Sequence, residues 1–378
     1  MQFHIAQFVV ADPQAAPSPL ARSACAVESA VSVQATGYDL SDPAEFLVRR
    51  YFDQSQTKKH WLVALADPPA PEAPLGPLGL AQVSATGSAP GEALGVAWAF
   101  LPRLDNLHLA MMDLSVRPDV RGQGIGTALL SEVVRAARAD ERRVLQTWSS
   151  HRLEAAPGTG LAVPTGIGEL SASDPEVRFA LQRGFVLKQG ERHSALTLPL
   201  PADAIAAWLA QAEAKALPGY RLVGWTGVTP PRWRPAMARL RVHMSTDVPL
   251  GETSFAKEIW DAERVAVHDQ GMTTRREVFT MAAQHLDSGE LVAYTQLVSP
   301  DDHPERVYQE DTLVVAAHRG HRLGLWVKAA NLQRLAQARP SAEVVHTWNA
   351  GENRWMLAVN EQLGFERVST GAAWELDL

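Results

Sequence analysis

The chain has 378 residues, enough for two domains of ordinary size, and 46% of them are hydrophobic, so a large core can be buried. Its net charge of −7 argues against nucleic acid as a main partner, because phosphate contacts need a basic surface. The single cysteine excludes an internal disulfide, and no apolar stretch reaches the roughly 18 residues of a spanning helix. The first residues also lack the order of a signal peptide, so we expect a cytoplasmic protein without a membrane partner.

The first predicted elements are strands at 60–66 and 78–83, on either side of a stiff proline-rich connection at 68–77. Residues 107–116 (LHLAMMDLSV) are mostly apolar and predict a buried strand. A turn with three glycines, RGQGIG at 121–126, follows this strand, and an amphipathic helix continues to residue 139. The first half of the chain therefore contains a strand, a glycine-rich turn and a helix in direct succession.

The same succession returns at 308–338, where the helix has an apolar stripe formed by Leu325, Trp326, Ala329, Leu332, Leu335 and Ala336. Four landmarks repeat in the same order: Arg121-Gly122 with Arg319-Gly320, Gly126 with Gly324, Thr147-Trp148 with Thr347-Trp348, and Gly184-Phe185 with Gly364-Phe365. A period near 200 indicates domain duplication, because solenoid repeats are far shorter. We expect an N-terminal domain at 1–200 and a C-terminal domain at 201–378, with the boundary at the prolines near residue 200.

The two copies differ in length between their last two landmarks. Thr147 to Gly184 spans 37 positions, whereas Thr347 to Gly364 spans 17, so the first copy carries about 20 extra residues, roughly 151–169. This insertion is rich in glycine and proline and predicts a loop. The loop is either a lid over a site or a surface excursion.

The glycine-rich turn at 121–126 has the properties of an anion site. Glycines remove side chains where the strand enters the helix, so that backbone N–H groups with no partner inside the helix can approach a ligand. This chemistry suits phosphate or pyrophosphate, although a tightly packed strand–helix turn is the alternative. The sequence lacks the Gly-Lys-Ser/Thr ending of a P-loop and the G-x-G-x-x-G spacing of a dinucleotide fold.

The segment VRPDVRGQGIGTALL closely resembles the acetyl-CoA signature of the GNAT acetyltransferase superfamily, R/Q-x-x-G-x-G/A, with Arg121, Gly124 and Gly126 at its defined positions. Residues 182–185 and 362–365 are similar to the end of that family's last helix. The resemblance implies two tandem GNAT-like domains of the α/β (α+β) class, each with a mixed, mainly antiparallel central sheet flanked by helices. It also implies acetyl-CoA as co-substrate.

The resemblance further implies where CoA binds. Backbone amides near Val116 and Val314 would polarise the thioester carbonyl, and the two turns would hold the pyrophosphate. In the second turn, RGHRLG, Arg322 replaces the family's middle glycine, and its guanidinium either crowds the pyrophosphate or binds it. The expected CoA-binding residues are Val116, Arg121, Gly122, Gln123, Gly124, Ile125 and Gly126 in the first copy and Val314, Arg319, Gly320, Arg322, Gly324 and Asn353 in the second.

Acyl transfer to an amine needs a base, and carboxylates inside apolar strands are candidates for that role. Asp113 and its counterpart Asp311, which follows Glu310, occupy the same position of the two copies, and such acids are hydrogen-bonded or have a raised pKa. We take Asp113, Asp311 and Glu310 as candidate catalytic residues, against the alternative of structural acids. His108 and His151 are further candidate bases.

The acid that protonates the thiolate has no obvious candidate in the sequence. Many GNAT members place a tyrosine four residues before the glycine of the last helix, where this chain has Ala180 and Asn360. Trp148, Trp348 and Asn349 follow the repeated threonines at the strand ends where the family's substrates enter. These three residues either contact substrate or, for the tryptophans, fill the core.

We therefore expect an N-acetyltransferase that moves an acetyl group from acetyl-CoA to a primary amine of a small molecule by direct transfer in a ternary complex. The alternatives are a non-catalytic acyl-CoA-binding sensor or scaffold, and one active domain beside a purely structural one. No cluster of His, Cys and Asp has metal-ligand spacing, so we expect no metal. The protein is expected to be a monomer or homodimer.

Overall fold

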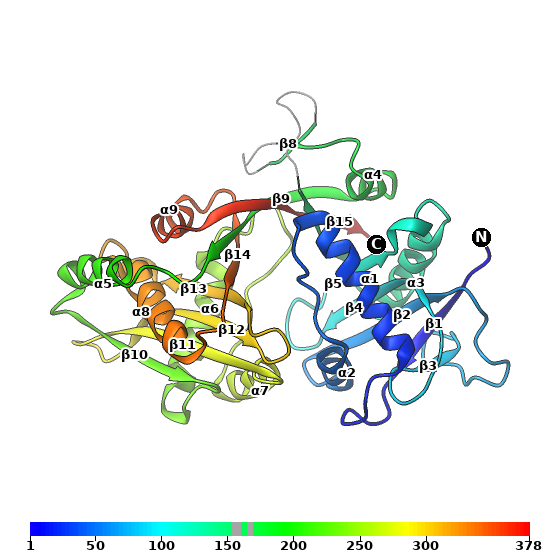
Figure 1. The fold of residues 1–378 in the computed structure, drawn as a ribbon, viewed down its shortest axis with the longest axis horizontal. Helices are drawn as coiled ribbons and strands as arrows, with labels where there is room; N and C mark the ends of the chain where they lie inside the picture. Colours follow the sequence, from blue (N-terminus) through cyan, green and yellow to red (C-terminus); the bar gives the residue numbers. More distant parts are fainter. Residues whose placement is uncertain (153–159, 165–168) are drawn as a thin grey trace. The chain divides into compact units, whose positions relative to one another are not determined.

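The computed structural model describes residues 1–152, 160–164 and 169–378, which form two compact units (Figure 1). The N-terminal unit contains Met1–Gly190 together with Glu252–Phe255 and Ser369–Leu378. The C-terminal unit contains Glu191–Gly251 and Ala256–Val368. We keep 1–200 and 201–378 as the proposed copies of the duplication; the compact units differ from them at 191–200, 252–255 and 369–378.

The N-terminal unit is built on a mixed sheet with the strand order β15-β6-β5-β4-β2-β1-β3. Its neighbours are antiparallel except for the parallel pairs β5/β6 and β1/β3. The strands are β1 (His4–Val9), β2 (Thr57–Leu65), β3 (Gln82–Ser84), β4 (Ala93–Pro102), β5 (Leu109–Val116), β6 (Val144–His151) and β15 (Glu366–Asp377). Of the strand expected at 78–83, only the last two residues lie in β3, because residues 77–80 form a turn and Ala81 makes an isolated bridge with Leu75.

Helices cover both faces of this sheet, and the sheet separates the core into two layers. One layer lies under α1 (Pro19–Thr36) and α2 (Ala44–Phe52), and α1 crosses in front of the strands in Figure 1. The other layer lies under α3 (Ile125–Ala139) and α4 (Pro175–Gln182). Because side chains alternate along a strand, Met111 of β5 packs in the first layer and Met112 in the second.

The C-terminal unit repeats this architecture with the strand order β10-β11-β12-β13-β14-β9, in which only β13/β14 are parallel. Its strands are residues 191–197 of β9 (Val186–Thr197), β10 (Tyr220–Thr226), β11 (Arg276–His285), β12 (Leu291–Pro300), β13 (Arg306–Val314) and β14 (Val344–Ala350). On one face lie α5 (Ala202–Ala216), α8 (Leu323–Ala338) and α9 (Arg354–Gln362), and on the other α6 (Arg234–Asp247) and α7 (Ala262–Met272). The predicted fold class is confirmed.

The last strand of each copy lies in the unit of the other copy. Residues 191–197 of β9 pair with β14 in the C-terminal unit, whereas residues 370–377 of β15 pair with β6 in the N-terminal unit. The two strands are counterparts, since each follows the Gly-Phe landmark of its copy. The duplicated halves have therefore exchanged their final strands.

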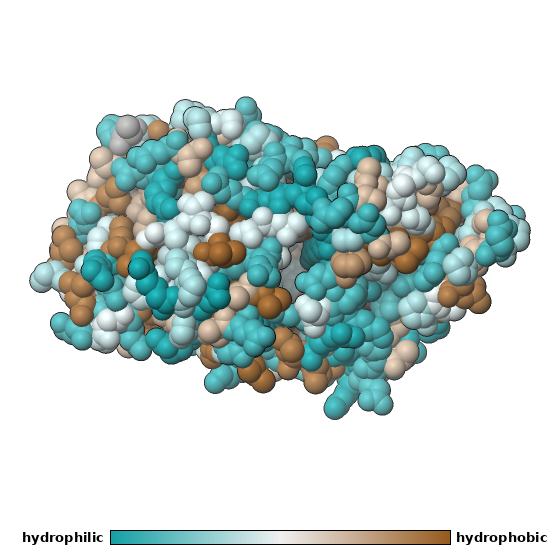
Figure 2. All heavy atoms as spheres, turned by 90° about the horizontal axis from the view of Figure 1, so that it is seen from below, coloured by the Kyte–Doolittle hydropathy of each residue, from teal (hydrophilic) through white to brown (hydrophobic). Residues whose placement is uncertain are grey.

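The surface carries polar and apolar residues together. On the face shown in Figure 2, hydrophobic residues occur in small groups among hydrophilic ones. Among the residues that the structure describes, no helix is both long enough and apolar enough to span a membrane.

Candidate acyl-CoA and acceptor site

The sheet of each unit opens at the end of its central parallel pair. In the N-terminal unit the pairing of β5 with β6 ends at Met112 and Thr147, yet β5 continues to Val116 and β6 to His151. Thr147 marks the point of divergence, because its Oγ1 donates a hydrogen bond of 2.8 Å to the carbonyl of Met112. Beyond that point the edge of β5 that faces β6 is left for another partner.

The C-terminal unit has the same opening. The pairing of β13 with β14 ends at Gln309 and Thr347, whereas the strands continue to Val314 and Ala350. The predicted residues Val116 and Val314 thus both end strands beyond the last parallel pair. Trp148, Trp348 and Asn349 lie on the facing strands of the same two openings.

The glycine turn of the first copy presents open backbone to solvent. Gly122 and Gly124 have φ values of 78° and 87°, and a Cβ at either would meet nothing within 4 Å. Glycine is therefore used here for backbone conformation rather than for packing. Gly124 begins α3 without a side-chain cap, so the first N–H groups of the helix are available to an anion.

Other residues of this turn hold it in place. The Nε of Arg121 donates to the Val116 carbonyl at 3.4 Å, and its guanidinium pairs with Glu176 of α4 at 3.2 Å. A Cβ on Gly126 would lie 3.3 Å from Phe179, so this glycine allows α3 and α4 to approach. The side chain of Ile125 is buried in the core, whereas Gln123 is exposed beside the turn.

The second turn repeats the hydrogen bond from the arginine to the valine carbonyl, but it lacks the middle glycine. The Nε of Arg319 donates to the Val314 carbonyl at 3.3 Å, and Gly320 has a φ of 88°. Arg322 adopts a left-handed φ of 56° at the start of α8, which costs a non-glycine residue about 1 kcal/mol. Its side chain is exposed, and Gly324 packs near Val314 as Gly126 does near Val116.

A cluster of three carboxyl groups, Glu28, Asp42 and Asp113, lies on the α1/α2 side of β5. Burial raises the pKa of Glu28 to about 8, and the charges of Asp113 and Asp42 add to that rise. Asp113 keeps contact with solvent, but desolvation by surrounding protein raises its pKa, while Arg50 opposes the rise. We call these three residues the acidic cluster.

Aromatic rings line the same face of the sheet. Trp98, which pairs with Asp113 across the strands, donates its Nε1–H to Glu28 at 3.0 Å. Its ring stacks between Trp61 and Phe100, with centroid distances of 4.6 and 5.7 Å. Carboxylates beside aromatic faces suit a cationic amine, which gains from both charge and the ring quadrupole.

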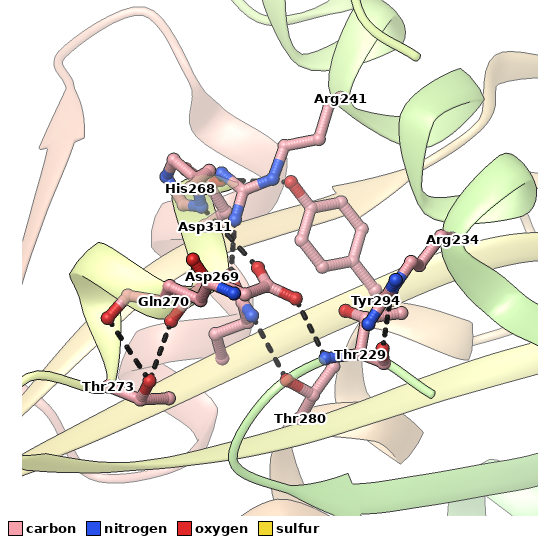
Figure 3. Close-up of polar contacts among 11 residues, drawn as sticks. Thr229, Arg234, Arg241, His268, Asp269, Gln270, Thr273, Thr280, Tyr294 and Asp311 are labelled. Atoms are coloured by element: carbon pink, nitrogen blue, oxygen red, sulfur yellow. Dashed lines mark hydrogen bonds and ion pairs between the residues drawn. The ribbon is translucent and has the colours of Figure 1, made fainter. Parts of the chain in front are cut away.

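The corresponding acid of the second copy is enclosed in a polar network (Figure 3). Asp311 forms an ion pair with Arg241 of α6 and accepts a hydrogen bond of 2.9 Å from the hydroxyl of Tyr294. Arg241 also donates to Gln296 at 2.7 Å and lies 5.4 Å from the Trp260 ring. Asp311 is thus neutralised by a guanidinium, while Glu310 is exposed on the neighbouring position of β13.

The two copies therefore place different ionisable groups, a carboxyl group and a guanidinium, beside corresponding residues of the sheet. Trp98 and Gln296 are 198 residues apart and correspond in the repeat. Trp98 is bonded to the carboxyl group of Glu28, whereas Gln296 is bonded to the guanidinium of Arg241. Sequence reasoning missed both partners because α1 and α6 share no recognisable landmark.

The positions expected for a general acid have different surroundings. Ala180 is buried in α4. Asn360 lies between two partners: its Oδ1 accepts from Lys328 Nζ at 2.6 Å and its Nδ2 donates to Asn349 Oδ1 at 2.6 Å. Lys328 is buried in α8, and burial lowers its pKa to about 7. The predicted substrate residue Asn349 is thus connected to a buried amine.

The remaining predicted residues have identifiable contacts. His108 Nε2 lies 2.8 Å from the carbonyl of Ser254, and Asn353 caps α9 by accepting from the Met356 N–H. Trp148 is 38% exposed, whereas Trp348 stacks on His193 at 4.3 Å. His151 is buried between Ser149 and Asp174.

Part of the predicted loop lies outside the described residues. Of the loop expected at 151–169, either a lid or a surface excursion, residues 153–159 and 165–168 are not described, and β7 (Leu161–Ala162) pairs with β8 (Glu169–Leu170). Within the described residues, no group of three or more His, Cys, Asp or Glu side chains is placed to hold a metal ion.

Comparison with known proteins agrees with this architecture. Residues 44–155 match the model of the acetyltransferase (GNAT) family. This match includes β4, β5, the glycine turn and α3. No curated protein matches the chain.

Solved structures extend the likeness to the full length. A tandem GNAT protein from the clavulanic acid biosynthesis pathway, without AcCoA, is 20% identical with a TM-score of 0.66 and covers 100% of this chain and 98% of its own. A GCN5-related N-acetyltransferase from Sphaerobacter thermophilus is 15% identical with a TM-score of 0.58, covering 99% and 95%. At these identities the structures establish a shared fold.

Proposed function

We propose that this chain transfers an acetyl group from acetyl-CoA to a primary amine of a small molecule. Residues 44–155 match the GNAT acetyltransferase family, and the whole chain is similar in fold to a tandem GNAT protein. The observation that carries this proposal is the arrangement of the N-terminal unit. An uncapped glycine turn, an opened parallel pair and the acidic cluster meet around the end of β5.

The acyl-CoA would bind along the opening. Backbone N–H groups at Gly122, Gly124 and the start of α3 can hold the pyrophosphate, because nothing fills the space above the two glycines. The free edge of β5 near Val116 can bind the thioester arm and polarise its carbonyl. Arg121 holds the glycine turn in position, since its side chain contacts Val116 and Glu176.

The acceptor amine would approach from the α1/α2 side. The acidic cluster attracts the ammonium form, and a carboxylate with a raised pKa can then remove its proton. Glu28 and Asp113 are the candidate bases, and the neutral amine attacks the thioester carbonyl directly in a ternary complex. Cleavage of the C–S bond gives the acetamide and CoA.

The C-terminal unit fits a different role. Its Asp311 is occupied by Arg241 and Tyr294, so it is not available as a base in this arrangement. The turn around Gly320 retains the hydrogen bond from the arginine to the valine carbonyl that is seen in the first copy. We propose that this unit holds acyl-CoA or supports the first unit structurally, without transfer of its own.

The test is release of free CoA thiol by the full chain with acetyl-CoA and a panel of primary amines, including polyamines and amino sugars. We expect amine-dependent release whose rate rises as the pH passes through about 8, because Glu28 must lose its proton to act as a base. Glu28→Gln keeps an acceptor for Trp98 but has no ionisable group. Its rate should be at least about 100-fold lower and lack this rise.

A matched control is Glu45→Gln on α2, whose carboxylate pairs with Arg22 at 2.7 Å and lies outside the acidic cluster. This variant should retain the rate and the pH profile of the unmodified chain. If no amine in the panel raised CoA release over the amine-free rate, transfer to small amines would be rejected.

A further inference from the structure

Three side chains of the N-terminal unit form a continuous hydrogen-bonded series. Ser149 Oγ lies 2.7 Å from His151 Nε2, and His151 Nδ1 lies 2.7 Å from Asp174 Oδ2. His151 is 1% exposed, whereas Ser149 is partly open to solvent. A serine, a histidine and a carboxylate in this order and spacing are the parts of a nucleophilic triad.

Neighbouring groups determine which atoms carry protons. Burial alone would raise the pKa of Asp174, but hydrogen bonds with His151 and Glu176 lower it to about 2, so the carboxylate is ionised. An ionised Asp174 accepts a hydrogen bond from the Nδ1–H of His151, and in the neutral imidazole with that tautomer Nε2 is the acceptor. Trp374 donates its Nε1–H to Ser149 Oγ at 2.8 Å, so the serine hydroxyl proton is directed to Nε2.

The series lies beside the proposed acyl-CoA site. Ser149 is two residues past Thr147, where β6 leaves β5, and alternation places both side chains on one face. Asp174 directly precedes α4, and Glu176 two residues later pairs with Arg121 of the glycine turn. The nucleophile is therefore on the α3/α4 side of the opening, whereas the acidic cluster is on the α1/α2 side.

We propose that Ser149, His151 and Asp174 form a nucleophilic triad that accepts the acyl group of acyl-CoA on Ser149 and gives the chain an amine-independent thioesterase activity. This inference rests on the acyl-CoA site of the proposed function but not on transfer to an amine. It is confined to the first copy, since the counterparts of Ser149 and His151 are Asn349 and Gly351.

In the first step Ser149 Oγ forms a bond to the thioester carbonyl carbon, and its proton moves to His151 Nε2. The C–S bond breaks, and the CoA thiolate takes that proton and leaves as the free thiol. In the second step water adds to the ester carbon and gives a proton to Nε2. Ser149 leaves, regains the proton, and a carboxylic acid is released.

The experiment measures acyl exchange without an amine. The full chain is incubated with acetyl-CoA and isotopically labelled free CoA, and the label that enters acetyl-CoA is followed, since reversal of the first step returns the acyl group to CoA. We expect exchange and slow hydrolysis for the unmodified chain. Ser149→Ala and Asp174→Asn should each lower exchange by about 1000-fold or more.

Two variants separate chemistry from folding. Ser150→Ala lies on the same strand with its side chain on the opposite face, and it should keep full exchange. Ser149→Cys should retain exchange and become sensitive to iodoacetamide, because the only native cysteine, Cys25, is buried. In that variant, an acetyl adduct on the peptide that contains the substituted position would support the triad.

The outcomes are distinguishable from those of the proposed function. Amine-dependent CoA release with neither exchange nor an adduct would overturn the triad and leave amine transfer in place. Exchange that is lost in Ser149→Ala, with no response to any amine, would support the triad and reject amine transfer. If acetyl-CoA failed to bind the chain in a calorimetric titration, the triad proposal would fall with its premise.

Discussion

At the scale of single residues, two aspartates in equivalent positions have different surroundings. Asp113 belongs to the acidic cluster, where desolvation raises its pKa. Asp311 has an ion pair with Arg241 and a hydrogen bond from Tyr294. Burial disfavours the charged form of Asp113, as at many catalytic sites. The carboxyl group of Asp311 is instead held by its ion pair and hydrogen bond, as in a structural network.

This contrast predicts that the same substitution, Asp→Asn, affects stability at one position and activity at the other. Asp311→Asn should lower the free energy of unfolding by about 2 kcal/mol, because it leaves the largely buried guanidinium of Arg241 without its counter-ion. This loss is smaller than for a fully buried pair, since Asp311 is 28% exposed. Asp113→Asn should leave stability almost unchanged and reduce amine-dependent CoA release. Urea unfolding and a thiol-release assay measure the two quantities. Equal destabilisation by both variants would contradict the contrast.

The sequence identified both aspartates but not their partners. An acid inside an apolar strand can be recognised from the pattern of β5 alone. The residues that decide its chemistry, Glu28 in one unit and Arg241 in the other, come from helices distant in the chain. Ser149 and Asp174 were missed for the same reason, since only folding brings them to His151.

At the scale of elements, the buried positions of α8 differ from its predicted apolar stripe, because another helix packs against it. The predicted stripe is buried at Leu325, Trp326, Ala329, Leu332 and Leu335, but Ala336 is exposed. Helix α5 packs in the same core, so further positions outside the stripe are covered. Lys328 is one of them, with its ammonium group near Asn360 and 5.2 Å from the Phe365 ring.

The burial of Lys328 predicts a pH-dependent stability of the C-terminal unit. A lysine pKa lowered from 10.5 to about 7 means that the unfolded chain binds more protons between these values, so unfolding free energy rises with pH across that window. Lys328→Met removes the ionisable group. It should melt a few degrees above the unmodified chain at pH 6, and the difference should vanish toward pH 10.

Calorimetry at several pH values measures this difference. Lys215→Met on α5, where the lysine is exposed, is the control and should show no pH-dependent change. A melting difference for Lys328→Met that stayed constant with pH would show that packing, rather than the charge, accounts for it.

At the scale of the whole molecule, the duplication has produced two unequal turns. Gly124 reaches φ 87° without steric cost, whereas Arg322 takes the corresponding position at φ 56°. We expect one acetyl-CoA to bind tightly per chain and a second more weakly, and Gly124→Arg should weaken the tight site about tenfold or more.

A calorimetric titration of the full chain gives both the stoichiometry and the affinities. Arg322→Gly is the matched change in the other turn and should leave the tight site unchanged. Two sites of equal affinity, or loss of the tight site in Arg322→Gly, would contradict the assignment of that site to the first copy.

The order of landmarks was enough to predict the duplication, whereas the fold class of each copy was implied by the resemblance of residues 116–130 to the GNAT signature. The exchange of the last strands could not be predicted, because a strand after Gly184-Phe185 or Gly364-Phe365 has the same alternating pattern whichever neighbour it pairs with. Local sequence specifies that a strand forms; the partner is decided by the assembled sheet.

The exchanged strands also fix an order of events during synthesis. Because β6 pairs with residues 370–377, the ribosome must make the whole second copy before the sheet of the first unit can be completed. Until then the edge of β6, with Ser149 and His151 on it, lacks Trp374 and its strand. The nascent N-terminal unit is thus a protein with an open sheet edge, which a chaperone or another chain could engage before its own last strand arrives.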